Sequence, residues 1–155
     1  MKYILAKPEE LSKWQKAAND VAEIMRLPDM ANNANFLDYA VRKLGQNEAI
    51  MAYDEENDMV AGFIGFSRSY NRITWLGVIK AYRRRGVGSG LIVAALDQLN
   101  ANEVITVKTY PGNYLPGEPA RNLYFKHGFV ETTGEVIVED GLEMVEFSLK
   151  PKAVK

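Results

Sequence analysis

The sequence contains no cysteine and only one histidine, His127. Without cysteine the chain can form no disulfide bond, thiolate metal ligand or cysteine nucleophile, which is compatible with a reducing cytoplasm. A single histidine makes a Ser-His-Asp triad or a multi-histidine metal centre difficult to assemble. Hydrolase and metalloenzyme functions are therefore disfavoured, and no bound metal is expected.

Long apolar runs and an excess of charge are also missing. No run of about 18 apolar residues occurs, and the apolar part of residues 1–7 is too short for a signal peptide. The 19 basic and 20 acidic side chains leave a net charge of −1, so no general attraction to nucleic acid or to an anionic membrane is expected. We predict a soluble, cytoplasmic protein without nucleic-acid or membrane partners, in which any anion site is local.

The sequence does contain enough apolar material for one core. It has 155 residues, of which 47% are hydrophobic and 25% charged. No internal repeat, low-complexity tract or long Pro/Gly/Ser linker divides it. We therefore predict a single domain over residues 1–155.

Helical and strand periodicities alternate along the chain. Strands are predicted at residues 3–6, 49–53, 59–67, 73–79, 104–109, 130–139 and 142–149, and helices from 11 to about 27, at 35–44, from the turn at 83–90 to 99, and from 119 to 128. Gly45 is expected to end the second helix in the left-handed conformation, Gly128 to end the fourth, and Asp140-Gly141 to form a hairpin turn. The strand-helix-strand order over residues 73–109 predicts a right-handed crossover and a parallel pair. The pattern thus indicates a mixed sheet covered by helices.

The most informative segment is the glycine-rich turn at residues 82–91, with the sequence YRRRGVGSGL. It joins an apolar strand to an amphipathic helix, where glycines let the backbone curl around an anion and the first helical turn presents unpaired N–H groups. The alternative is a tight turn whose arginines are solvated. The P-loop ending Gly-Lys-Ser/Thr is absent, and Leu91 stands where the dinucleotide fingerprint needs a small residue, so ATP and NAD are disfavoured.

This segment resembles the pyrophosphate-binding motif of the GNAT superfamily of N-acetyltransferases, Arg/Gln-x-x-Gly-x-Gly/Ala. Two frames fit, Arg83 with Gly86 and Gly88 or Arg85 with Gly88 and Gly90, and the flanking Tyr82 and Ser89 favour the first. The resemblance implies that backbone N–H groups of residues 84–89 contact the pyrophosphate of acetyl-coenzyme A, and that the preceding strand exposes backbone groups to the pantetheine arm. The coenzyme-binding residues predicted in this way are Leu76, Gly77, Val78, Arg83, Arg84, Arg85, Gly86, Val87, Gly88, Ser89 and Gly90.

A second resemblance lies at residues 120–129, ARNLYFKHGF, which is similar to the family's Ala-x-x-Leu-Tyr-x-x-x-Gly-Phe segment. It implies that the Tyr124 hydroxyl lies near the thioester sulfur and protonates the departing thiolate as a general acid. The alternative is a core residue, because Tyr124 shares a helical face with Ala120 and Leu123. Gly117 stands where the family often has asparagine, so the coenzyme contact of that asparagine is not carried over.

The resemblance implies an α/β (α+β) fold. It consists of a mixed, largely antiparallel central sheet of about six to seven strands, with a parallel fourth and fifth strand, flanked by about four helices. The implied activity is transfer of acetyl from acetyl-coenzyme A directly to a primary amine of a small molecule or peptide, through a ternary complex, since no cysteine can carry the acetyl group. A homodimer is also expected on family grounds.

Other features of the function stay open at this stage. The sequence does not identify the general base, for which Glu118 and Glu139 are two candidates among many carboxylates. The acceptor site is expected to involve residues 29–35, the second helix and residues 110–119. A non-catalytic acyl-coenzyme A sensor or interaction module would keep the same glycine-rich turn. A nucleic-acid module using residues 82–85 has little support, because no wider basic face accompanies them.

Overall fold

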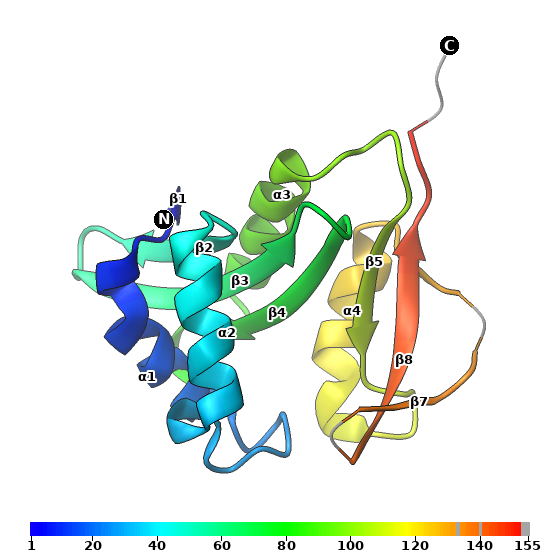
Figure 1. Ribbon diagram of the computed structural model, residues 1–155, viewed down its shortest axis with the longest axis horizontal. Coiled ribbons are helices and arrows are strands. Elements are labelled where there is room, and N and C mark those ends of the chain that lie inside the picture. The colour runs from blue at the N-terminus through cyan, green and yellow to red at the C-terminus, as the bar shows by residue number, and fades with distance from the viewer. Residues whose placement is uncertain (133, 140, 153–155) are drawn as a thin grey trace.

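A mixed sheet forms the centre of the computed structural model, which describes residues 1–132, 134–139 and 141–152 (Figure 1). The strands are β1 (Lys2–Leu5), β2 (Ala49–Asp54), β3 (Met59–Ser67), β4 (Arg72–Val78), β5 (Ile105–Thr109), β6 (Val130–Glu131), β7 (Ile137–Glu139) and β8 (Leu142–Leu149). Their order is β1-β2-β3-β4-β5-β8-β6, and β7 also pairs with β8. Among these pairings only β4–β5 is parallel. The predicted fold class is confirmed, with eight strands in the described residues.

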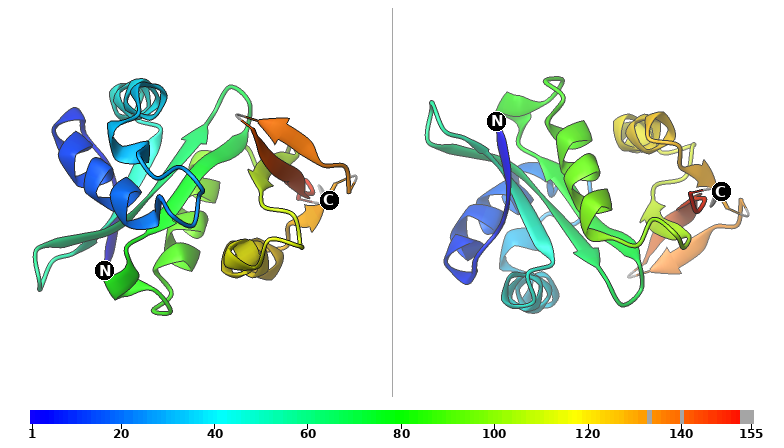
Figure 2. Two further views of the ribbon diagram at one scale, coloured as in Figure 1. Left: turned by 90° about the horizontal axis from the view of Figure 1, so that it is seen from below. Right: turned by 90° about the horizontal axis from the view of Figure 1, so that it is seen from above.

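Helices cover both faces of this sheet. They are α1 (Leu11–Val21), α2 (Ala34–Gly45), α3 (Val87–Gln98) and α4 (Glu118–Lys126), with short 3-10 helices at Pro8–Glu10, Met30–Asn32, Lys80–Tyr82 and Leu115–Gly117. Figures 1 and 2 show α1 and α2 on one face and α3 and α4 on the other. None of the helices in the described part of the chain has both the length and the apolar character that crossing a membrane requires.

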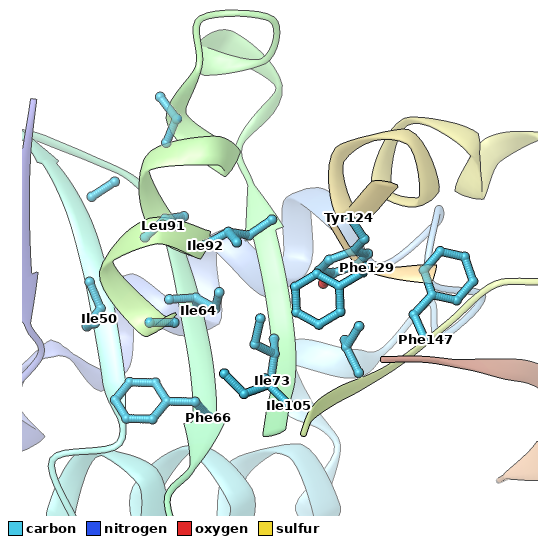
Figure 3. Close-up of a cluster of buried hydrophobic side chains, with 14 of the residues drawn as sticks. Ile50, Ile64, Phe66, Ile73, Leu91, Ile92, Ile105, Tyr124, Phe129 and Phe147 are labelled. Atoms are coloured by element: carbon cyan, nitrogen blue, oxygen red, sulfur yellow. The ribbon is translucent and has the colours of Figure 1, made fainter. Parts of the chain in front are cut away.

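Each face of the sheet has its own hydrophobic core. Under α1 and α2, the fully buried Trp14 stacks on Phe63 with ring centroids 5.1 Å apart and meets Trp75 edge to face. On the other face, aliphatic residues of α3 pack on β3 and β4, and Tyr124, Phe129 and other side chains near α4 continue the cluster (Figure 3). The sheet is thus buried on both sides near its centre, which accounts for the nearly continuous apolar run of β3.

Two helix ends differ from the sequence prediction. The helix α1 ends at Val21 rather than near residue 27, and residues 22–26 follow it as turns. These turns end where Arg26 adopts a left-handed φ of 58° and Leu27 N–H donates to Ala22 O. The helix α2 continues through Gly45, which is not left-handed, and Asn47 with φ of 57° closes it. Asparagine tolerates this conformation, so it takes the position that glycine was expected to fill. The prediction for Gly128 is confirmed, with φ of 91°.

The strand predicted at residues 130–139 is interrupted. Its two ends form β6 and β7, and both pair with β8. Gly134 between them has φ of 73°, which an extended strand cannot accommodate. In the predicted hairpin turn, Gly141 has φ of 78°, whereas Asp140 lies outside the described residues.

A bulge in β4 determines where that strand separates from β5. Gly65 pairs with Trp75 and Phe66 with Ile73, which leaves Thr74 as an extra residue opposite β3. The parallel pairing with β5 involves only Arg72 and Ile73 of β4. Beyond Thr74 the two strands diverge, as Figure 1 shows.

The bulged residue is held by α2. Tyr39 Oη and Thr74 Oγ1 lie 2.5 Å apart in a hydrogen bond. A Cβ atom added to Gly65 would overlap the Tyr39 hydroxyl, so glycine at this position makes room for the contact. Burial raises the pKa of Tyr39, which keeps its phenol protonated.

We expect Gly65→Ala to lower the free energy of unfolding by about 1–3 kcal/mol, because the added methyl group would displace Tyr39 from Thr74. Urea denaturation measures this change. Gly45→Ala is the matched control, since nothing lies within 4 Å of the position of its Cβ and it should be neutral or stabilising. An equal decrease in the free energy of unfolding in the two variants would contradict the packing role assigned to Gly65.

Candidate active site

The glycine-rich turn follows the diverging end of β4 and opens α3. Gly86, with φ of 79°, is the N-cap residue of α3, and no side chain caps this helix end. Gly90 N–H donates to Gly86 O at 3.0 Å as the first bond of the helix. The N–H groups of Val87, Gly88 and Ser89 therefore belong to the first turn, where no intrahelical acceptor is available. This geometry suits an anion.

The three arginines of the turn have different surroundings. Arg83 folds back on the protein: its Nε donates to Val78 O at 3.0 Å, and its guanidinium lies 3.7 Å from the Asp20 carboxylate. Arg84 is exposed with a left-handed φ of 62°, and Arg85 lies over the ring of Tyr82 at 5.2 Å. Arg83 thus fixes the turn to β4 and α1, while the other two present positive charge to solvent.

Packing explains glycine at three of the predicted coenzyme-binding positions. A Cβ atom on Gly77 would come within 2.5 Å of the Trp75 ring, and one on Gly90 would overlap the phenol of Tyr3 from β1. At Gly88 the added atom would lie 2.7 Å from Leu123 Cδ2. The turn therefore lies directly against α4, the helix that carries Tyr124.

Tyr124 has a ring buried in the core and a hydroxyl group that remains available to donate a hydrogen bond. Its ring is 4% exposed and packs edge to face on Phe129, with centroids 5.6 Å apart. Burial raises the pKa of Tyr124 well above its ordinary value of 10.0, and the nearby phenols of Tyr110 and Tyr39 raise it further. Among the described residues, none is found hydrogen-bonded to its hydroxyl. In Figure 3 the side chain points from α4 toward the sheet. The phenol is thus a protonated donor.

His127 connects the two segments that the sequence singled out. Its Nε2 lies 2.6 Å from Ser89 Oγ, so a hydrogen bond joins the end of α4 to the first turn of α3. The sequence placed His127 only at a helix end, because a contact across a sequence separation of 38 leaves no local signal. This bond fixes Tyr124 relative to the glycine-rich turn.

An aromatic contact joins the end of α1 to the segment before α4. The guanidinium of Arg26 lies 3.6 Å from the ring centroid of Tyr114, whose hydroxyl donates to Ile24 O at 2.6 Å. The Tyr114 ring also packs on Tyr110 at 5.0 Å. Residues 110–119 therefore meet the α1–α2 connection at Ile24 and Arg26, which lie before the segment 29–35 that was predicted for the acceptor site.

A cavity of about 420 Å³ lies on the α2 face, beside the start of β4 and β5. Charged and hydroxyl side chains dominate its lining: Tyr39, Arg42, Lys43, Gln46, Glu48, Ser67, Ser69, Tyr70, Arg72, Ile73, Thr74, Thr106, Lys108, Glu139, Met144 and Glu146. Of the two base candidates, Glu139 lines this cavity in an ion pair with Lys108, whereas Glu118 opens α4. In the described part of the chain, no group of three or more His, Cys, Asp or Glu residues could hold a metal ion.

The Ser89–His127 contact predicts a pH dependence of stability. Burial lowers the pKa of His127 below its ordinary value of 6.5, and the Lys126 charge lowers it further. A histidine whose pKa falls on folding stabilises the native state above the unfolded pKa, and this contribution is lost as the pH falls toward the folded pKa. We expect His127→Gln to lower the Tm more at about pH 7.5 than at about pH 5.

Thermal unfolding of both proteins across this pH range checks the prediction. Because His127 is the only histidine, no histidine titrates in the variant, and its pH dependence of Tm is the baseline for that of the wild type. A difference in Tm that stays constant with pH would contradict the assigned role.

Comparisons with known proteins agree with this architecture. The acetyltransferase (GNAT) domain family matches residues 27–151. The fold is similar to that of a GNAT-family acetyltransferase from Bacillus cereus (TM-score 0.72, 16% identity, covering 98% of each chain). It is also similar to PaiA N-acetyltransferase from Thermoplasma acidophilum, solved with coenzyme A (TM-score 0.72, 14% identity, covering 96% of this chain and 98% of that one).

A third similar structure is diaminobutyrate acetyltransferase EctA from Paenibacillus lautus, solved with L-2,4-diaminobutyric acid and coenzyme A (TM-score 0.73, 16% identity, covering 99% of this chain and 96% of that one). A search of curated proteins gave no match. At these identities the structures establish the fold, and the family match over most of the chain establishes membership. The chain belongs to the GNAT acetyltransferases, which use acetyl-coenzyme A as the acetyl donor.

Proposed function

We propose that this protein is an N-acetyltransferase that transfers acetyl directly to a primary amine of a small molecule or peptide within a ternary complex. The observation that carries the proposal is the Ser89–His127 hydrogen bond, which joins an uncapped glycine-rich helix start to the helix bearing a buried, protonated Tyr124. We further propose that residues 1–155 act as one domain, since β1 to β8 form a connected sheet. We also propose that this domain is cytoplasmic.

The residues around the turn fit a coenzyme pyrophosphate. The N–H groups of Val87, Gly88 and Ser89 provide donors at the positive end of α3, and exposed Arg84 and Arg85 provide positive charge. Backbone groups of residues 76–78 lie on the part of β4 that has separated from β5, where a pantetheine arm can pair with a strand. Acetyl-coenzyme A supplies the acetyl group as a thioester.

Tyr124 is the proposed general acid. After the ammonium group has released a proton to water, the neutral nitrogen forms the new N–C bond as the C–S bond breaks, and the Tyr124 hydroxyl donates a proton to the leaving sulfur. The nitrogen then releases its second proton to water to give the amide, and Tyr124 regains a proton from water. The raised pKa of the phenol means that it holds this proton at neutral pH. The absence of cysteine from the sequence supports direct attack without an acetyl-cysteine intermediate.

The coenzyme site is tested by Gly88→Glu. The carboxylate would repel the pyrophosphate and its side chain would also displace Leu123 of α4, so acetyl-coenzyme A should no longer raise the Tm. The Tm without ligand reports the displacement of α4 separately. In the wild type, ligand at about 100 times its Kd should stabilise the fold by about 2.7 kcal/mol.

Val93→Glu is the matched control for Gly88→Glu. Val93 is a half-exposed residue of the same helix away from the turn, and the variant adds the same charge. Its Tm should rise with acetyl-coenzyme A as in the wild type. A normal rise in Gly88→Glu would remove the turn from the coenzyme site.

The role of Tyr124 is tested by Tyr124→Phe, which keeps the buried ring and removes only the hydroxyl. We expect kcat to fall by roughly 10²-fold or more while coenzyme affinity stays the same. Thiol release with a panel of amines measures kcat, and calorimetry measures affinity. Tyr53→Phe removes an exposed hydroxyl bonded to Asp58 and should keep full activity. Wild-type turnover by Tyr124→Phe would limit Tyr124 to packing.

A further inference from the structure

The cavity beside α2 contains charged side chains that form no ion pair within the described part of the chain. Two of its ion pairs are internal: Lys43 Nζ lies 3.1 Å from Glu48 Oε1, and Lys108 pairs with Glu139. In the described residues, the remaining charged side chains of the lining have no ion-pair partner; these are Arg42, Arg72 and Glu146. The cavity therefore presents two guanidinium groups and one carboxylate to a ligand.

The two arginines converge on the same region. Arg42 lies on α2 beside Lys43, whose Nζ donates to Phe66 O of β3. Arg72 of β4 pairs with Ser67, the next residue of β3, and both arginines line the cavity. Burial lowers the pKa of Lys43, its pairing with Glu48 opposes this effect, and the charges of both arginines lower the pKa further. Guanidinium groups bind carboxylates through paired N–H donors, so two of them at one end of a cavity suit a carboxylate.

The unpaired carboxylate of the lining, Glu146, comes from a different element than the two arginines. Glu146 of β8 is opposite Lys108 of β5, and both side chains line the cavity. Lys108 is already paired with Glu139, so Glu146 remains available for a ligand cation. An ammonium group next to a carboxylate, as in the head group of an amino acid, matches this separation of charges.

The cavity borders the bulge in β4. Tyr39 lines it one helical turn before Arg42, and Thr74 lines it two residues after Arg72. These two side chains meet at the bulge from which β4 and β5 diverge. A ligand held by the arginines would therefore lie beside the bulge at which β4 and β5 diverge.

We propose that this cavity binds the head group of an amino acid and that the acetyl acceptor is a diamino acid. Arg42 and Arg72 bind the carboxylate, Glu146 binds the α-ammonium group, and the side-chain amine extends past Tyr39 to the thioester. This inference rests on the acetyltransferase function proposed above and defines its acceptor class. The chemistry is the acetyl transfer already given, with the new N–C bond at the side-chain amine.

The test compares diamino acids with the diamines that lack only the carboxylate. L-ornithine and putrescine form one pair, and L-lysine and cadaverine the other. Calorimetric titration of each into the protein, with and without saturating coenzyme A, measures binding without turnover. We expect at least one of the two amino acids to bind about tenfold or more tightly than its diamine.

Variants assign this preference to the cavity. Arg42→Gln and Arg72→Gln should each weaken binding of the preferred amino acid about tenfold and leave the diamine unchanged. Glu146→Gln should weaken both members of a pair, since both carry ammonium groups. Lys150→Gln, which removes an exposed cation outside the cavity, is the control and should change neither.

Two results would overturn the proposal. One is equal affinity for amino acid and diamine in both pairs, including the absence of binding by all four compounds. The other is an equal loss of binding affinity for the amino acid and its diamine in the Arg42→Gln and Arg72→Gln variants. Failure of the proposed acetyltransferase function would be detected separately, because the protein would then not bind coenzyme A when it is titrated for these experiments. The cavity is still tested in that case, because the amino acids are also titrated into the protein alone.

Discussion

The extra residue Thr74 in β4 bends this strand away from β5, and the sites on both faces of the sheet depend on that separation. Without the bulge, parallel pairing could continue along the strands and close the space between them. On one face the bulge meets Tyr39 of α2 and borders the charged cavity. On the other face the separated end of β4 leads into the glycine-rich turn. A donor and an acceptor can thus approach one point from opposite sides.

The proposed donor side depends on contact between α3 and α4. Ser89 bonds His127, and Leu123 lies against Gly88, so the first turn of one helix is fixed to the last turns of the other. This contact places Tyr124 at a constant distance from the turn. A larger residue than glycine at 88 would push α4 away, which gives that glycine a structural reason in addition to its proposed place in the coenzyme site.

Local patterns in the sequence predicted the sheet, the crossover and the glycine-rich turn, because each depends on residues close in the chain. The positions that sequence analysis missed depend on tertiary contacts. Nothing near Thr74 indicates a bulge, and Arg42 and Arg72 come together only through the packing of α2 on the sheet. The helix end at Asn47 was missed for another reason: glycine and asparagine both tolerate a left-handed φ, and propensity ranked Gly45 first.

The two interpretations of Tyr124, core residue and general acid, require the same environment. A tyrosine exposed to water has a pKa near 10 and no fixed direction, whereas a ring packed on Phe129 has both a fixed direction and a higher pKa. Burial therefore does not compete with the proposed catalytic role. The hydroxyl distinguishes the two interpretations. No described residue is found hydrogen-bonded to it, and phenylalanine would fill a core position equally well.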